Sequence, residues 1–194
     1  MPSTDRKMPC HIAFFCLVWV ACVQLAPSAW CQPLWNEDEQ RFSVGLKLFP
    51  AALGALESLE ERRNEAGALE ILVVHAGGDD LAREAAQHLI RLGSIRDLPL
   101  SVRTIDRDAL DRGAHPPPAG IFVASVGMRG EWLRRWSERT GGLVFSPFAG
   151  DVEAGAIAGV HVSDRILPAV NLTQARRAGL VFKPFFLKVA RVHE

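Results

Sequence analysis

Three short apolar segments, rich in β-branched and aromatic residues, and one segment over 100–105 in which apolar and polar residues alternate recur along the chain. Stretches with helical periodicity separate these four segments. The segments occupy residues 69–75, 100–105, 120–126 and 143–146. Apolar segments of this length, bounded by turn residues, are typical of buried strands. Strands that alternate with helices predict a mainly parallel sheet with right-handed crossovers. The predicted fold class is therefore α/β, as a three-layer αβα sandwich.

The stretches between these segments carry the signals that begin and end helices. Residues 81–92 gather apolar side chains on one face, with Asp79 as the expected N-cap and Gly93 as the stop. Residues 108–112 and 131–139 have the same character over shorter lengths. Each crossover of the predicted sheet thus has its helix.

An earlier helix is indicated by apolar residues that recur at steps of four, three, four and three. These residues are Phe42, Leu46, Phe49, Leu53 and Leu56. The spacing predicts one buried helix face over residues 36–63. Pro50 lies inside the pattern and lacks a backbone N–H, so we expect a kink or two short helices that meet near Phe49.

The last third of the chain departs from this alternation. Residues 159–163 and 166–172 predict a β-hairpin added to the sheet. A short helix is expected over 173–178, and Pro184 is well placed in the first turn of a terminal helix over 185–192.

The first 28 residues have the order of a secretory signal. Arg6 and Lys7 precede an apolar run over 12–25, which is too short to span a bilayer, and Ala26 and Ser28 offer small residues for cleavage. Cleavage after Cys31, a lipoprotein and an uncleaved anchor are the alternatives. The predicted organisation is a signal peptide over 1–28, a flexible segment over 29–39 and a single α/β domain over 40–194.

Composition excludes some classes of function. Lys and Arg total 22, as do Asp and Glu, so no global basic field exists to attract nucleic acid. The chain contains no Gly-x-Ser-x-Gly, Gly-x-x-x-x-Gly-Lys or Gly-x-Gly-x-x-Gly motif after its first predicted strand. We therefore predict no catalytic residue, no cofactor and no metal.

One group of polar residues follows the predicted strands, where open α/β sheets bind ligands. His75 and Asp79 surround the turn after the first strand, and Ser125 and Arg129 follow the third. They predict an alternative function, a periplasmic small-molecule-binding protein that uses a crevice at the strand ends. A hydrolase that uses His75 and Asp79 is a third hypothesis.

The C-terminal region carries the most specific pattern. Residues 168–180 read PAVNLTQARRAGL, and residues 185–192 read FFLKVARV. This run resembles the closing signature of the YfiR-like family (YfiR/HmsC, DUF4154), in which an Asn-Leu step, an Ala/Arg helix with Ala-Gly and a Leu-x-x-Ala-x-Val segment end the domain. The rest of residues 40–194 is similar in architecture.

The resemblance implies a periplasmic regulator that is not an enzyme. Such a protein binds and restrains the sensing domain of an inner-membrane diguanylate cyclase or histidine kinase, and so affects cyclic-di-GMP or biofilm output. A homodimer is possible through a free edge of the hairpin. The residues predicted to contact the partner are Phe42, Lys47, Phe49, Arg176, Arg177, Phe186, Lys188 and Arg191.

The terminal segment gives a separate physical reason to expect binding. As a helix, it places Phe185 and Phe186 on one face while Lys188 and Arg191 line another. A cationic strip beside apolar residues is a typical docking surface. We expect Phe185 to belong to the core and the charged residues to face solvent.

Overall fold

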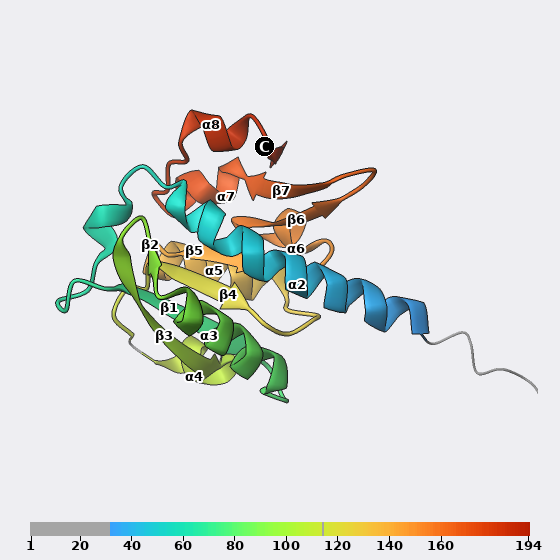
Figure 1. Cartoon of the computed structure of the whole chain (residues 1–194), viewed down its shortest axis with the longest axis horizontal. Helices are drawn as coiled ribbons and strands as arrows, with labels where there is room; N and C mark the ends of the chain where they lie inside the picture. Colours follow the sequence, from blue (N-terminus) through green and yellow to red (C-terminus); the bar gives the residue numbers. More distant parts are fainter. Residues whose placement is uncertain (1–31, 114) are drawn as a thin grey trace, which may run out of the picture. The chain divides into compact units, whose positions relative to one another are not determined.

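The computed structural model describes residues 32–113 and 115–194, with side chains from Glu37 onward (Figure 1). Residues 36–194 form one compact unit. The predicted signal peptide over 1–28 and Cys31 lie outside the described residues.

An eight-stranded sheet forms the middle layer. The strands are β1 (Leu69–His75), β2 (Ser94–Ile95), β3 (Leu98–Asp106), β4 (Gly120–Val123), β5 (Leu143–Ser146), β6 (Ala158–Val162), β7 (Ile166–Asn171) and β8 (Arg191–His193). Their order is β2-β3-β1-β4-β5-β6-β7-β8, and the five strands from β3 to β6 run parallel. β2 and β7 are antiparallel to their neighbours β3 and β6, which confirms the predicted hairpin.

Helices flank both faces of this sheet. They are α2 (Gln32–Gly54), α3 (Asp80–Leu92), α4 (Arg107–Arg112), α5 (Gly130–Thr140), α6 (Asp151–Ala154), α7 (Leu172–Arg177) and α8 (Pro184–Leu187), with a 3-10 turn at Leu59–Arg62. Helix α3 connects β1 to β3, which lies on one side of β1 in the sheet. Helix α5 connects β4 to β5, which lies in the opposite direction, so right-handed crossovers place α3 and α5 on opposite faces. The α/β three-layer sandwich is confirmed.

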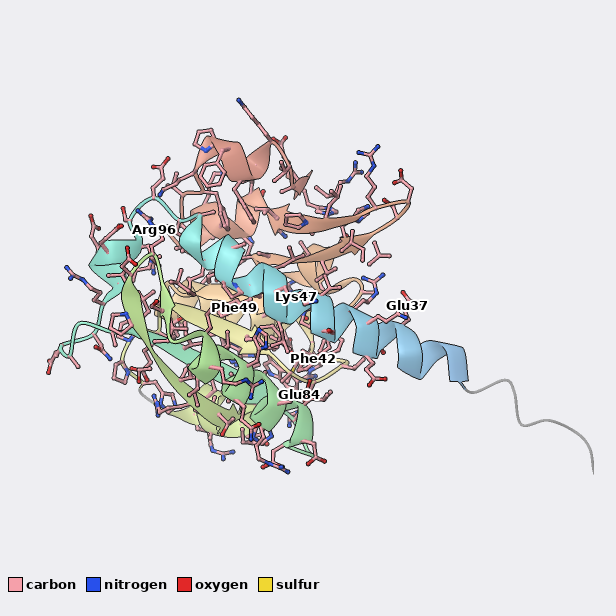
Figure 2. The ribbon with its side chains drawn as sticks, in the orientation of Figure 1. Glu37, Phe42, Lys47, Phe49, Glu84 and Arg96 are labelled. Carbon is pink, nitrogen blue, oxygen red and sulfur yellow. The ribbon has the colours of Figure 1, made fainter. Side chains whose placement is uncertain are left out.

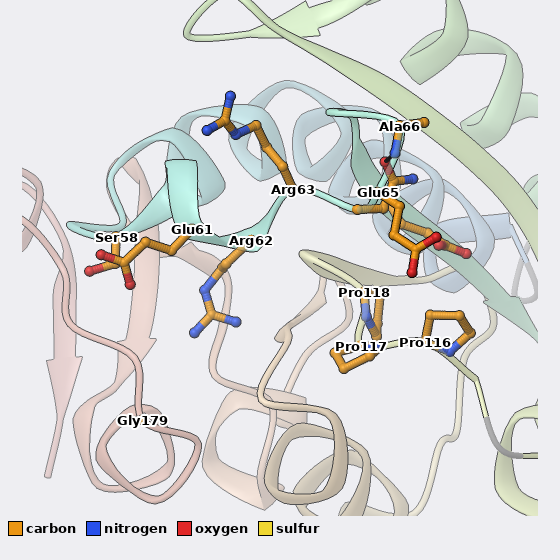
Figure 3. A pocket seen from close by; sticks show the side chains of 12 residues that line it. Ser58, Glu61, Arg62, Arg63, Glu65, Ala66, Pro116, Pro117, Pro118 and Gly179 are labelled. Atoms are coloured by element: carbon orange, nitrogen blue, oxygen red, sulfur yellow. Dashed lines mark hydrogen bonds between the residues drawn. The ribbon is translucent and has the colours of Figure 1, made fainter.

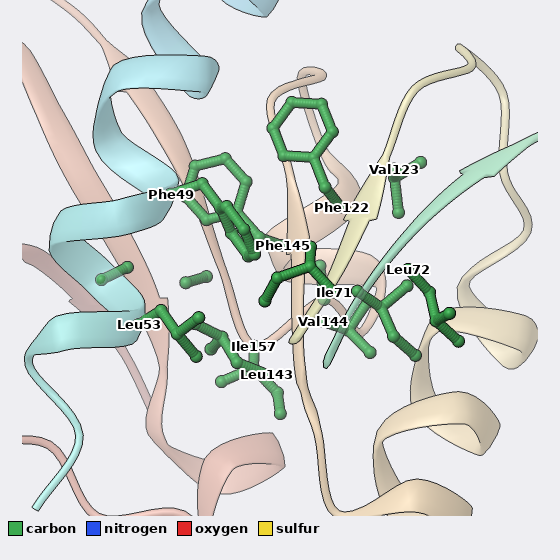
Figure 4. Close-up of a cluster of buried hydrophobic side chains, with 14 of the residues drawn as sticks. Phe49, Leu53, Ile71, Leu72, Phe122, Val123, Leu143, Val144, Phe145 and Ile157 are labelled. Atoms are coloured by element: carbon green, nitrogen blue, oxygen red, sulfur yellow. The ribbon is translucent and has the colours of Figure 1, made fainter. Parts of the chain in front are cut away.

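Three phenylalanines join α2 to the middle of the sheet (Figure 4). The Phe49 ring lies edge-on against Phe122 and Phe145, with ring centroids 5.6 Å away in both cases. Phe122 and Phe145 stack at 5.8 Å. A Cβ atom on Gly120 would lie 2.9 Å from Phe49 Cζ, so β4 begins with the one residue that lets the ring approach.

Helix α2 excludes one of the two alternatives predicted at Pro50. The structure has one continuous helix in place of two short ones that meet near Phe49. Phe49 and Leu53, which lie on either side of the proline, are both fully buried. Packing of this face against the sheet offsets the missing N–H of Pro50.

Within the segment predicted to be flexible, residues 32–39 are helical, because α2 already begins at Gln32, and residues 29–31 lie outside the described residues. Glu37 accepts a hydrogen bond from Arg41 Nε at 3.0 Å, four residues on, and Arg41 Nη1 donates to Val160 O at 3.3 Å. The first contact supports the helix and the second fixes it to β6.

The predicted terminal helix is the largest error. Residues 185–192 split into α8, which ends at Leu187, and β8, which pairs with β7 in parallel. The outer edge of β7 presents unpaired backbone groups, and pairing with β8 satisfies them. β8 therefore covers residues 169–171 of the hairpin edge that we expected to be free for dimerisation.

Helix caps are partly as predicted. Gly93 ends α3 with a positive φ of 76°, but Asp79 makes no side-chain cap. Its Oδ1 instead accepts a hydrogen bond from Arg83 at 2.9 Å. Asp106 and Asn171 are capping side chains, at the starts of α4 and α7.

The aromatic contact at Phe49 generates a stability prediction. Phe49→Ala is expected to lower the free energy of unfolding by about 3–5 kcal/mol, because it empties the space between α2 and the sheet. Lys47→Ala, on the exposed face of the same helix, should change it by less than about 0.5 kcal/mol. Urea denaturation followed by circular dichroism measures both, and similar losses in the two variants would contradict the assignment.

Candidate functional site

The structure places the predicted crevice residues at the carboxyl edge of the sheet. His75 ends β1, and Ser125 lies two residues beyond β4. β1 and β4 run parallel, but the order in which successive strands are added to the sheet reverses between them. Open α/β sheets bind ligands at such a point. The Ala76 N–H donates to Ser125 Oγ at 3.0 Å, so the two loops meet.

The polar groups at this edge are engaged with close neighbours. His75 Nδ1 lies 3.3 Å from Gly77 O, and Arg129 Nη2 lies 2.9 Å from Glu131 Oε1. The hydrogen bond from Arg83 holds the pKa of Asp79 below its usual value. Among the described residues, no hydrogen bond joins His75 to Asp79 or to Ser125.

Sequence reasoning missed Arg107 at this edge. The guanidinium carbons of Arg107 and Arg129 lie 4.4 and 4.5 Å from the centre of the Trp132 ring. The half-buried tryptophan holds both cations by cation–π attraction. Trp136, four residues on, is fully buried. Arg107 follows β3 directly, so its place at the strand end was the available signal.

A second group that the sequence did not reveal is a buried carboxyl. Asp151, at the start of α6, is 7% exposed and accepts a hydrogen bond from Ser146 Oγ at 2.5 Å. Burial raises the pKa of Asp151 to about 6, against the effect of the Ser146 hydrogen bond and with a contribution from Glu153 and Asp38. The group therefore changes charge near neutral pH.

The predicted partner contacts divide into two sets. Phe42, Phe49 and Phe186 are buried in the core, so their prediction as contact residues is wrong. The aromatic rings complete the packing of α2 and α8 and cannot reach a partner. The cations remain available, because their side chains are exposed; they are Lys47 on the outer face of α2 (Figure 2), Arg176, Arg177, Lys188 and Arg191.

The C-terminal segment turns one set of apolar residues outward and another inward. Val181, Phe185 and Val189 are 57%, 63% and 56% exposed. Phe182 and Phe186 are buried and stack on each other with ring centroids 5.5 Å apart. The expectation that Phe185 belongs to the core is therefore wrong, since the ring of the next residue takes that place.

Backbone hydrogen bonds hold this segment against the end of α2. The Glu57 N–H donates to Val181 O at 2.9 Å, and the Lys183 N–H donates to Ala55 O at 2.8 Å. The outward residues Val181, Phe185, Lys188, Val189 and Arg191 make up what we call the C-terminal surface. In the part of the chain that the structure describes, Lys188 and Arg191 take part in no ion pair.

A concavity lies at the other edge of the sheet, where β1 and β4 begin (Figure 3). We call it the amino-edge cavity; its volume is about 880 Å³. It is lined by Ser58, Glu61, Arg62, Arg63, Asn64, Glu65, Ala66, Glu70, Pro116, Pro117, Pro118 and Gly179. Neither the predicted crevice residues nor the predicted partner contacts belong to this lining.

Within 32–113 and 115–194, no three His, Cys, Asp or Glu side chains are grouped to hold a metal ion. None of the helices in those ranges has the length and apolar character needed to cross a bilayer.

Comparisons with known proteins place the fold. No family model and no curated protein matches the chain. Similar solved structures include a conserved domain protein from Vibrio cholerae O1 biovar El Tor strain N16961, with 14% identity, a TM-score of 0.52 and 79% of this chain covered. Another is an ABC domain in complex with L-Trp from Streptococcus pneumoniae, with 10% identity, a TM-score of 0.47 and 73% covered. The alignments span 60% and 62% of those two chains, respectively.

The burial of Asp151 predicts that the difference in stability between the wild type and Asp151→Asn depends on pH. Its folded pKa of about 6 exceeds the ordinary 3.8, so this group stabilises the fold at low pH, and that contribution is lost as the pH rises from about 4 to 6. Asp151→Asn keeps an acceptor for Ser146 and carries no charge. We expect the variant to be more stable by about 1–3 kcal/mol at pH 7.5.

Urea denaturation at pH 4 to 8 measures this difference. The advantage of Asp151→Asn should disappear near pH 4 and level off above pH 7. A difference that does not depend on pH would show that the carboxyl is not desolvated in the folded protein.

Proposed function

We propose that this protein is a non-enzymatic regulator that acts in the periplasm. It binds the sensing domain of an inner-membrane signalling protein, a diguanylate cyclase or a histidine kinase, and holds it inactive. Cyclic-di-GMP or biofilm output then depends on whether the receptor is bound. The observation that carries the proposal is the C-terminal surface, with its exposed Phe185.

The apolar part of this surface supplies affinity. Phe185 lies in α8 and Val189 in the turn that follows it, and both side chains are exposed. Burying an exposed phenylalanine contributes about 1.5–3 kcal/mol. The inward stack of Phe182 and Phe186 fixes the backbone beneath them. An anchored aromatic residue therefore meets its partner without a large entropic cost.

The charged part selects the partner. Lys188 and Arg191 flank the apolar residues, while the whole chain carries a formal charge of +0. The cationic character is thus a local property of this surface. An acidic face on the receptor complements it, speeds encounter and disfavours other partners.

The resemblance to the YfiR-like family supports the same segment. The run over 168–192 that carries it spans α7, α8 and most of β8, with the C-terminal surface among them. Arg176 and Arg177, also in this run, are exposed at the end of α7, which contacts β8.

A second candidate function is the binding of a small molecule at the carboxyl edge of the sheet. The observation that favours it is that Arg107 and Arg129 both lie over the Trp132 ring. This pair of cations is at the carboxyl edge, where the strand order reverses between β1 and β4. Such a site would take a planar anion. We place it second because His75, Ser125 and Arg129 are already engaged by neighbouring groups.

A substitution in the C-terminal surface tests the regulator. Phe185→Glu is expected to reduce receptor capture at least about tenfold, because it removes the aromatic anchor and adds a charge that repels an acidic partner. The measurement is in-cell crosslinking of the exported protein, with mass spectrometry of the captured cyclase or kinase. The same variant should fail to restrain cyclic-di-GMP or biofilm output in a deletion strain.

Ile90→Glu is the matched control. Ile90 is 59% exposed on α3, close to the value for Phe185, and lies on a different element. The control should capture the receptor like the wild type, and the double variant Lys188→Glu with Arg191→Glu should behave like Phe185→Glu. Equal capture by all variants, or a wild-type protein that captures no inner-membrane cyclase or kinase, would overturn the proposal.

A further inference from the structure

The amino-edge cavity contains a partly buried arginine whose hydrogen-bonding capacity is largely unused. Arg62 Nη1 donates to Gly141 O at 2.6 Å. Among the described residues, no carboxylate oxygen lies within ion-pair distance of its guanidinium. A guanidinium has five N–H donors in a planar fork, so most of this fork is available to a ligand.

Arg62 differs from the exposed arginines of the surface. Burial lowers the pKa of its guanidinium, and the nearby Glu61 partly offsets that effect. A desolvated cation without an ion-pair partner gains more from a bound anion than an exposed one does. Figure 3 shows its side chain extending into the space between the Glu61 turn, Gly179 and Pro117.

The remaining lining adds acidic groups and an apolar wall. Glu65 is exposed, forms no ion pair among the described residues, and points toward Pro118 (Figure 3). Pro116, Pro117 and Pro118 form the wall opposite Arg62. Of the three acidic side chains in the lining, Glu70 is paired with Arg103, whereas Glu61 and Glu65 form no ion pair among the described residues. A simple anion therefore meets their repulsion as well as the attraction of Arg62.

These features together fit a molecule that carries both signs of charge. We propose that the amino-edge cavity binds a small zwitterion, with its carboxylate on the Arg62 fork, its ammonium group toward Glu65 and its apolar part against Pro117 and Pro118. The volume of about 880 Å³ lies in the range of small-molecule sites. The proposal stands whether or not the C-terminal surface binds a receptor.

The test uses thermal unfolding of the exported protein with three sets of probes. They are the free α-amino acids, their N-acetyl derivatives, which lack the ammonium charge, and their amides, which lack the carboxylate. At 10 mM, at least one free amino acid should raise the melting temperature by about 5 °C, as expected for a ligand at one hundred times its dissociation constant. Its N-acetyl and amide derivatives should each lose most of this shift.

Variants locate the binding. Arg62→Gln should abolish the shift, and Glu65→Gln should remove the preference for the free amino acid over its N-acetyl derivative. Among the described residues, the Glu65 side chain makes no hydrogen bond or ion pair, so its variant is expected to fold even where Arg62→Gln, which loses the bond to Gly141, does not. Glu57→Gln, an exposed residue of the same segment outside the lining, is the control and should respond like the wild type.

Two-dimensional NMR supplies an independent readout. The responding amino acid should move the amide signals of Ala66 and Gly179, which line the cavity, and leave those of α3 unchanged. No shift with any free amino acid, an undiminished shift in both Arg62→Gln and Glu65→Gln, or signals that move only at the carboxyl edge would overturn the proposal.

Discussion

The packing of Phe49 against Phe122 and Phe145 is the contact on which the rest of the structure depends. It holds α2 across the sheet and so fixes where α2 ends. The residues after that end, 55–57, then bond the backbone of 181–183. The backbone that carries Val181 is thus bonded to the residues that follow the helix held by this aromatic contact.

Polar side chains at the two edges of the parallel sheet differ in how far neighbouring groups satisfy their hydrogen bonds and charges. At the carboxyl edge, backbone groups and neighbouring side chains satisfy His75 and Ser125, and Trp132 holds Arg129. At the amino edge, Arg62 is desolvated and bonds a single carbonyl. Fold-level expectation places ligands at the carboxyl edge. The unsatisfied group lies at the opposite edge, so the proposed site follows from the side chains and not from the topology.

Local patterns predicted most of the sheet, because β1, β4 and β5 are short apolar segments and β3 alternates apolar and polar residues. The terminal strand was not predictable in this way. Residues 185–192 have a helical spacing, and only the unpaired edge of β7 makes 191–193 extended. In the same segment, Phe185 is exposed although we expected it in the core, and Phe186 is buried although we expected it to contact a partner. The β2–β3 turn gave no signal either, since Arg96 and Asp97, with φ of 51° and 64°, stand where glycine or asparagine is usual.

The candidate site was predictable in its charges and not in its aromatic contacts. The exposure of charged residues such as Lys188 and Arg191 can be predicted without knowledge of tertiary contacts. Which of the adjacent residues Phe185 and Phe186 is buried depends on the side chains that each ring contacts. The segment that carries the C-terminal surface also reaches the amino-edge cavity, because Gly179 lines the cavity and Val181 bonds Glu57, the residue before Ser58. A zwitterion bound in this cavity therefore lies in the same concavity as Gly179, two residues before Val181. One short segment of chain joins the two proposed sites.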